Sequence, residues 1–276
     1  MLKEDKIIAL YWIVDDLLKG IDHQEPLNRK VFDREVITTA LVAALYFGGH
    51  LENATGFMKR TGLVPRMLDN SRFSRRLHGL TELLCTLFFQ VGQHLKDMAG
   101  ASHYVVDCFA VAVCANIRIS RSKLLKAEQW SGKQLSMRRY FYGVKLPVLT
   151  TASGIVVEFC FVPGSESHLQ ALKKLPLSVA EESSIYADSA YTDYTTIEDD
   201  MKEADFIKLR VQRKSNSKRK DEPWIRFLKE HMRKGIETTF SMLKALFLRK
   251  IHAVTFQGFL LKIMLFIVAY TFDKLV

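Results

Sequence analysis

The sequence contains few of the residues that mark several protein classes. Only 14 of its 276 residues are glycine and 6 are proline, which excludes a collagen-like or low-complexity chain. Its four cysteines show no Cys-x-x-Cys spacing and are too sparse for the disulfide scaffold of a small secreted domain. Hydrophobic residues make up 48% of the chain, which excludes global disorder. We therefore expect one large or two modest folded domains, whose cysteines are buried free thiols.

Long uncharged hydrophobic runs are also missing. The first residues carry acidic side chains, unlike a signal peptide, and the apolar run 7–14 ends at Asp15 and Asp16 without a small-residue cleavage site. The most apolar stretch, residues 259–272, is short for a membrane span and contains Lys262. We expect it to be a core helix, and the protein to be cytoplasmic with no membrane partner.

The sequence has fewer acidic than basic residues. The chain has 30 acidic residues against 40 lysines and arginines, a net charge of +10. Residues 1–100 carry a net charge of +1 and residues 101–276 carry +9. Such an excess predicts a polyanionic partner, bound mainly by the second part of the chain.

Residues 1–100 show helical periodicity throughout. We expect a helix over about 51–60, a Gly/Pro turn at 61–65, and a long helix that begins near Asn70 with Ser71 as its N-cap. Arginines at the start of that helix are typical of a helix-turn-helix DNA-binding motif. An ordinary all-α bundle with solvated arginines explains the pattern equally well.

The pattern changes to alternating strands and helices after residue 100. We expect strands at 104–113, 140–150, 154–162, 184–187 and 206–211, and helices at 167–174, 193–204 and after Pro223. The turn at 151–154 makes the second and third strands a hairpin. The order βββαβαβα predicts an α+β fold, in which an all-α region (1–100) precedes a five-stranded mixed sheet flanked by helices (101–276).

Three carboxylates of the second part suggest a metal site. Asp107 and Asp188 lie in or at the end of apolar strands, where an acid needs a compensating partner. Glu237 lies on the helix after the last strand. Three such groups could bind two divalent cations about 3.5 to 4 Å apart and activate phosphoryl transfer. They can do so only if the two strands are neighbours.

Short blocks along nearly the whole chain carry a family resemblance. They are Asp107 with Cys114-Ala-Asn-Ile-Arg-Ile-Ser-Arg-Ser-Lys123, Tyr142-Gly-Val-Lys145, Val157-Glu158 with Pro163-Gly-Ser165, Tyr186-Ala-Asp-Ser-Ala-Tyr191, Asn216-Ser-Lys-Arg219, residues 233–240 with Ile251-His-Ala-Val254, residues 35–45 and residues 71–78. These blocks resemble the DDE transposases of bacterial insertion sequences, most closely insertion sequence family 982. The resemblance implies a ribonuclease-H-like (retroviral integrase-like) catalytic domain over 101–276.

The resemblance also implies a site and a reaction. Asp107, Asp188 and Glu237 correspond to the catalytic, metal-binding triad, expected to hold two Mg²⁺ ions, with Mn²⁺ as the alternative. The reaction is cleavage at transposon ends, then transfer of the 3′-hydroxyl into target DNA, carried out by a homodimer in the synaptic complex. Glu230 stands where a related signature has tyrosine, and it could compete with Glu237 as a ligand; the alternative is an ion pair with Arg226 or Lys234.

Basic residues supply the predicted DNA contacts. They are Arg72, Arg75, Arg76, Arg118, Arg121, Lys123, Arg138, Arg139, Arg213, Lys214, Lys218, Arg219, Arg233 and Lys244. Such groups neutralise phosphates, although a solubilising charged loop gives the same composition. His103, His168 and His252 have no second ligand at helical or strand spacing, so we expect structural roles. Two other functions remain open: a nuclease without strand transfer, and a non-catalytic DNA-binding protein derived from a transposase.

Overall fold

The computed structural model describes residues 3–99, 102–115, 119, 124–125, 127–134, 139–204, 206–214, 216–217, 219–247, 251 and 253–276. The chain forms two compact units. The first, which we call the helical unit, comprises Met1–Gln90 and Leu243–Val276; the second, the sheet unit, comprises Val91–Met242. Two long helices, α5 and α8, each begin in one unit and end in the other.

The helical unit is built from the helices at the two ends of the chain. Its elements are α1 (Lys3–Gly20), α2 (Asp33–Tyr46), α3 (Leu51–Arg60), α4 (Asn70–Gly79), α9 (Phe256–Asp273), the first half of α5 (Thr81–Ala99) and the end of α8 (Pro223–Leu246). Helices α2 and α9 are apolar around most of their circumference and pack against each other. A helix that is apolar on all sides must be buried on all sides, which makes this pair the centre of the unit.

Helix α9 is long and apolar enough to cross a membrane by length and composition. Most of it is buried inside the protein, from Phe259 to Phe272. Its polar N-terminus is capped by Thr255, whose hydroxyl accepts a hydrogen bond from the Gly258 amide. The sequence prediction of a core helix over 259–272 is therefore confirmed.

Two predictions for residues 61–99 were wrong in detail. Asp69, not Ser71, caps α4, because its carboxylate accepts the Arg72 backbone N–H at 2.9 Å. The predicted long helix is two helices, which separate at Leu80. Residues 61–69 join α3 to α4, a connection longer than the three or four residues typical of a helix-turn-helix.

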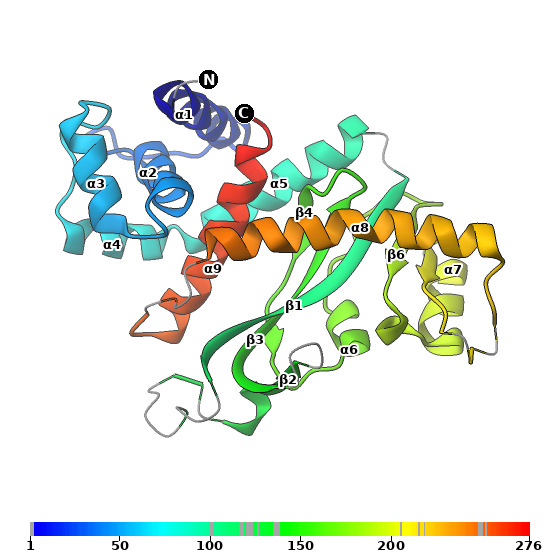
Figure 1. The fold of residues 1–276 in the computed structure, drawn as a ribbon. Coiled ribbons are helices and arrows are strands. Elements are labelled where there is room, and N and C mark those ends of the chain that lie inside the picture. Colours follow the sequence, from blue (N-terminus) through cyan, green and yellow to red (C-terminus); the bar gives the residue numbers. More distant parts are fainter. Residues whose placement is uncertain are drawn as a thin grey trace. The chain divides into compact units, whose positions relative to one another are not determined.

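The sheet unit contains a mixed sheet (Figure 1). Its strands are β1 (His103–Ala115), β2 (Ser131–Gln134), β3 (Arg139–Thr151), β4 (Val156–Phe159), β5 (Val162–Pro163), β6 (Ser184–Ala187) and β7 (Lys208–Val211). Within the described residues the order is β2-β3-β1-β6-β7, and β4 and β5 also pair with β3. Strand β1 is antiparallel to β3 and parallel to β6, which is parallel to β7. The predicted α+β fold is confirmed.

The described sheet has seven strands where the sequence predicted five. The third predicted strand is divided into β4 and β5, which pair with separate parts of β3. The short β2, rich in polar residues and glycine, has no apolar alternation and was not predicted. The hairpin was predicted correctly: Gly154 closes its turn with φ of +82°, a conformation that favours glycine.

Helices cover both faces of the sheet. Tyr104, Val106 and Ala187 point to one face, where they form a core with residues of α6 (His168–Leu172), the π-helix η5 (Tyr194–Asp199) and α7 (Asp200–Ala204). On the other face α8 crosses the strands, and the Phe240 ring lies 4.9 Å from the Phe109 ring (Figure 1). Successive side chains of a strand alternate between faces, so Asp107 points toward α8.

The compact units differ from the predicted division near residue 100. Helix α9 packs with α2, and residues 243–276 therefore belong to the helical unit. A contact between segments so far apart in the chain leaves no local sequence signal. Cys85, Cys108 and Cys160 are free, as predicted, and half-buried; the side chain of Cys114 lies outside the described residues.

Candidate active site

Strand register brings Asp107 and Asp188 together. In the parallel pair β1 and β6, His103 faces Ser184 and Val105 faces Tyr186. The same register continued by two residues places Asp107 opposite Asp188, which directly follows β6. Both side chains then lie on the α8 face, because Val106 and Ala187 occupy the opposite face. The requirement that the two strands be neighbours is met.

Arg233 of α8 lies between the two aspartates. Its Nη2 is 3.9 Å from Asp107 Oδ2, and its Nη1 is 3.6 Å from Asp188 Oδ1. Both distances exceed those of hydrogen bonds, so the contacts are electrostatic. Nη1 donates instead to Gln212 Oε1 at 2.5 Å, while Nε is buried without a hydrogen-bond partner among the described residues. The guanidinium is therefore anchored to Gln212 and faces the carboxylates at longer range.

Gln212 was not predicted as a site residue. It directly follows β7, and its backbone N–H donates to the Ala187 carbonyl at 2.9 Å, which extends the β6–β7 pairing to the end of β6. Val211 points into the core on the other face, so Gln212 points toward α8. The signal was available in the sequence: a polar residue ends the strand next to the one that carries Asp188.

The pKa of Asp107 reflects first its burial and then the charges around it. Burial raises the pKa of Asp107 to about 6, although the Cys108 backbone N–H and the Arg233 charge lower it. The charges of Asp188 and Glu237 raise it further. A cation placed between these carboxylates would reverse this effect.

Glu237 and Glu230 differ in their surroundings. Glu237 is exposed, and it is close enough to Asp107 for its charge to raise the pKa of that carboxyl. Glu230 accepts a hydrogen bond from Arg226 Nε at 2.9 Å across one turn of α8. This ion pair is the alternative that the sequence left open for Glu230, and it favours Glu237 as the third carboxylate of the site.

The donor set suits a hard divalent cation. Asp107 within β1 and Asp188 just after β6 offer carboxylate oxygens on neighbouring strands, and Glu237 adds a third nearby. Oxygen-only ligation is what Mg²⁺ and Mn²⁺ accept. Cys108 lies on the opposite face, where the Tyr191 hydroxyl donates to its sulfur, and burial raises the pKa of its thiol to about 12. A protonated thiol there does not compete for the ion.

Comparison with known families agrees with this geometry. The profile of the transposase DDE domain matches residues 98–253, more than half of the chain. The chain belongs to the transposase DDE domain family. No curated protein and no solved structure was found to match the sequence. Transposases of this family act on DNA, and DDE domains generally use divalent metal ions.

The predicted DNA-binding residues are in different environments. Arg72 and Arg75 are exposed on α4, although Arg72 also pairs with Asp69 at 3.2 Å. Lys244 and Lys214 are exposed as well. These four side chains are accessible to a ligand. Arg118, Arg121, Lys123, Arg138, Lys218, the side chain of Arg139 and His252 lie outside the described residues.

Two arginines of the basic loop 213–220 form ion pairs with acidic residues of η5. Arg213 forms a two-pronged ion pair with Glu198 and lies over the Tyr194 ring. Arg219 pairs with Asp199 at 3.3 Å and lies over the same ring. Both side chains therefore fix the loop to η5.

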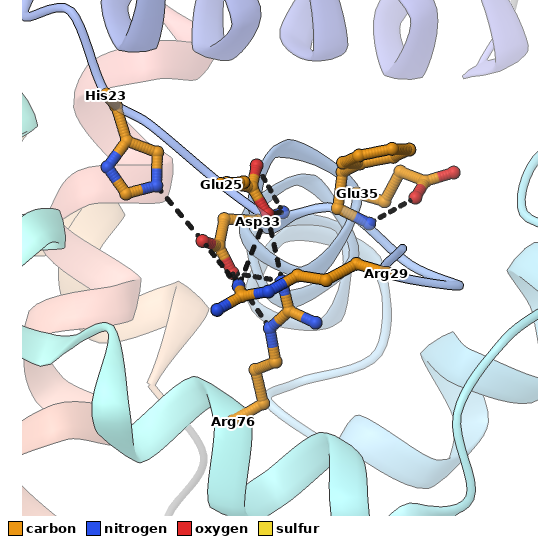
Figure 2. Close-up of polar contacts among 7 residues, drawn as sticks. His23, Glu25, Arg29, Asp33, Glu35 and Arg76 are labelled. Atoms are coloured by element: carbon orange, nitrogen blue, oxygen red, sulfur yellow. Dashed lines mark hydrogen bonds and ion pairs between the residues drawn. The ribbon is translucent and has the colours of Figure 1, made fainter. Parts of the chain in front are cut away.

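Arg76 belongs to a partly buried ion network of the helical unit, centred on the buried Asp33 (Figure 2). Its Nη2 lies 2.5 Å from Asp33 Oδ1 and 3.0 Å from Glu25 Oε2. Arg29 and His23 also reach Asp33, at 3.1 and 3.0 Å. The two acids of the network were not predicted, because their partners come from separate helices and loops.

Ligand atoms of His23, Glu25 and Asp33 lie within 4.8 Å of one another, close enough to hold a metal ion. The guanidinium groups of Arg29 and Arg76 already compensate the two carboxylates (Figure 2). A cation added here would repel two arginines. We therefore assign the network to the stability of the fold.

Histidines near the sheet have aromatic neighbours. The His103 ring lies 5.9 Å from that of Tyr186, and the His168 ring lies 5.3 Å from that of Tyr191. Burial lowers the pKa of His168. The packing of both rings against tyrosines agrees with the structural role expected from the sequence.

Proposed function

We propose that this transposase cuts DNA at the ends of an insertion sequence of the family 982 type and transfers the freed 3′-hydroxyl into target DNA. Asp107, Asp188 and Glu237 are the catalytic carboxylates in this proposal. The observation that carries it is the approach of Asp107 in β1 and Asp188 just after the neighbouring parallel strand β6, beneath a helix that supplies Arg233 and Glu237. The active form is a homodimer that holds two ends.

Asp107, Asp188 and Glu237 would hold the divalent ions, with Mg²⁺ as the expected ion and two ions per site. Bound ions supply the activation of a water or a 3′-hydroxyl and the stabilisation of the leaving oxygen. The chain's own residues orient the ligands. The Cys108 and Ser189 backbone N–H groups donate to Asp107 Oδ1 and Asp188 Oδ1, at 2.7 and 2.5 Å.

Basic side chains around a cavity of the sheet unit would hold the DNA backbone. The cavity has a volume of about 670 Å³ and is lined by Arg213, Lys214, Asn216, Lys220, Asp221 and Arg226. The charge of Arg213 is compensated by Glu198, whereas Lys214 and Lys220 are exposed and accessible to phosphates. Duplex end recognition is assigned to Arg72 and Arg75 on α4.

The test is incubation of the purified protein with duplex DNA that carries candidate element ends and Mg²⁺. Nicks at the ends and joined products are mapped by sequencing gels, with the Asp188→Asn protein in parallel. We expect nicking and joining by the wild type and neither by the variant. Nicking without joining would indicate a nuclease, and DNA binding without chemistry would indicate a non-catalytic DNA-binding protein. Either result contradicts the proposal.

A further inference from the structure

Arg233 is a basic side chain that faces both aspartates of the proposed metal site. Its two terminal nitrogens approach one carboxylate each, Asp107 at 3.9 Å and Asp188 at 3.6 Å, and only 14% of its side chain is exposed. Neither contact is a hydrogen bond. The side chain is thus held near the carboxylates without satisfying them.

The anchor of the guanidinium explains this arrangement. Gln212 accepts from Nη1 at 2.5 Å, and Gln212 is itself fixed by the pairing of its backbone with Ala187. Gln212 therefore positions Arg233 at the margin of the carboxylate pair. Movement of Arg233 away from the aspartates breaks no hydrogen bond to either carboxylate, so it costs less than breaking a buried, hydrogen-bonded ion pair.

We propose that Arg233 is the counter-cation of the metal-free site, and that a divalent ion binds Asp107 and Asp188 by displacing it. The inference rests on the proposed function, because it assumes that these aspartates bind the metal. A guanidinium and a divalent ion cannot share the same two carboxylates without mutual repulsion. Displacement separates the guanidinium from both carboxylates. Metal affinity is therefore lower than the carboxylates alone would give.

The first experiment measures Mn²⁺ binding to the full-length protein without DNA, from the electron paramagnetic resonance signal of free Mn²⁺. Arg233→Gln should bind Mn²⁺ about tenfold more tightly than the wild type, because a positive charge a few ångströms from the ion has been removed. Arg226→Gln is the matched control: it removes a guanidinium that pairs with Glu230 on the same helix, and it should bind as the wild type does. Equal or weaker binding by folded Arg233→Gln would overturn the proposal.

A second measurement uses the wild type alone, in case Arg233→Gln does not fold. Phenylglyoxal modifies accessible arginines, and peptide mass spectrometry gives the rate at each position. Saturating Mn²⁺ should raise the rate at Arg233 and leave that of the exposed Arg226 unchanged. An unchanged or slower rate at Arg233 contradicts displacement.

Asp188→Asn separates this inference from the function on which it rests. Loss of Mn²⁺ binding in Asp188→Asn, with no gain in Arg233→Gln, rejects the counter-cation and leaves the metal site standing. Mn²⁺ binding that survives in Asp188→Asn rejects the metal site itself, and the counter-cation with it.

Discussion

Each unit of this transposase contains carboxylates and arginine in contact, and the two clusters differ in how closely the charges meet. In the helical unit, Arg76 lies 2.5 Å from Asp33 and also reaches Glu25, so the buried acids are hydrogen-bonded. In the sheet unit, Arg233 stays 3.6 and 3.9 Å from Asp188 and Asp107. A closed network stabilises a fold, whereas loosely contacted carboxylates can exchange one cation for another. The same residue types thus serve structure in one unit and, in our account, chemistry in the other.

The largest expected difference concerns the carboxylates of α8. Glu237→Gln should reduce cleavage and joining by about a thousandfold or more, because removal of a reacting-centre ligand leaves the chemistry unsupported. Glu230→Gln, which breaks only the exposed pair with Arg226, should keep the wild-type rate. Initial rates on end-bearing duplexes with Mg²⁺ measure both. If Glu230→Gln lost activity and Glu237→Gln kept it, Glu230 would be the metal ligand instead of Glu237.

The next largest effect tests the closed network. Arg76→Gln removes the shortest contact of the buried Asp33 and one ion pair of Glu25, and should lower the free energy of unfolding of the helical unit by about 3 to 5 kcal/mol. Arg226→Gln breaks an exposed pair and should cost at most about 0.5 kcal/mol. Hydrogen exchange of α2 amides reports the local value. Similar exchange in both variants would show that the network contributes no special stability.

The third prediction uses pH, with EDTA present. Burial raises the pKa of Asp107 to about 6, so the folded protein binds this proton more tightly than the unfolded chain. Protonated Asp107 therefore contributes about 2 to 3 kcal/mol to the free energy of unfolding. This contribution is fully present below the unfolded pKa of about 4 and is lost as pH rises through 6. Between pH 4 and 7, the exchange of β1 amide hydrogens should therefore accelerate more than the intrinsic pH dependence of exchange predicts. Asp107→Asn should abolish that excess.

Asp33 should behave in the opposite way. Burial alone would raise its pKa, but hydrogen bonds from His23 and Arg76 bring the pKa below its usual value. The unfolded chain then binds this proton more tightly, so stability is present above pH 4 and is lost as pH falls through the folded pKa. Acid should therefore weaken α2 protection at pH values where β1 is still protected. Loss of hydrogen-exchange protection in α2 and β1 at the same pH would contradict the opposite pKa shifts of Asp33 and Asp107.

The smallest effect concerns DNA recognition. Substituting Arg72 and Arg75 by Gln should reduce the preference for element ends over random DNA by about 1 to 3 kcal/mol per lost base contact. The double substitution Lys214→Gln with Lys220→Gln should weaken binding to both duplexes alike, because phosphate contacts carry no sequence information. It should also reduce the salt dependence of the affinity. Binding titrations at several salt concentrations separate the two. Equal losses of affinity for both duplexes in the Arg72 and Arg75 variant would show that α4 does not recognise the sequence of the element ends.

Local patterns were sufficient to predict much of the sheet unit. The strand 184–187 was predicted with its observed bounds, and β1 and the β3–β4 hairpin were predicted to within a few residues, because apolar alternation and a glycine turn are local signals. The acids Asp107 and Asp188 stood out as charges in apolar strands. Their approach depends on strand order, which the family resemblance supplied and periodicity alone did not.

Features that depend on distant residues were missed. The packing of α9 against α2 joins opposite ends of the chain, and the ion network requires Arg76 to reach Asp33 from another helix. Arg233 was predicted as a DNA contact, and its place between two aspartates became visible only once β7 had set Gln212 beside β6. Sequence identifies such residues individually; register and helix placement determine which of them meet.

The most direct test of the distinction between the clusters is Mn²⁺ binding by the wild type, Asp188→Asn and His23→Ala, followed by electron paramagnetic resonance. His23, Glu25 and Asp33 could geometrically hold an ion, so His23→Ala removes one of its ligands without removing a buried charge pair. Our account predicts that Asp188→Asn loses Mn²⁺ binding at the Asp107–Asp188 site, while His23→Ala binds as the wild type does. Undiminished binding by Asp188→Asn, together with loss in His23→Ala, would contradict it and place the metal centre in the helical unit.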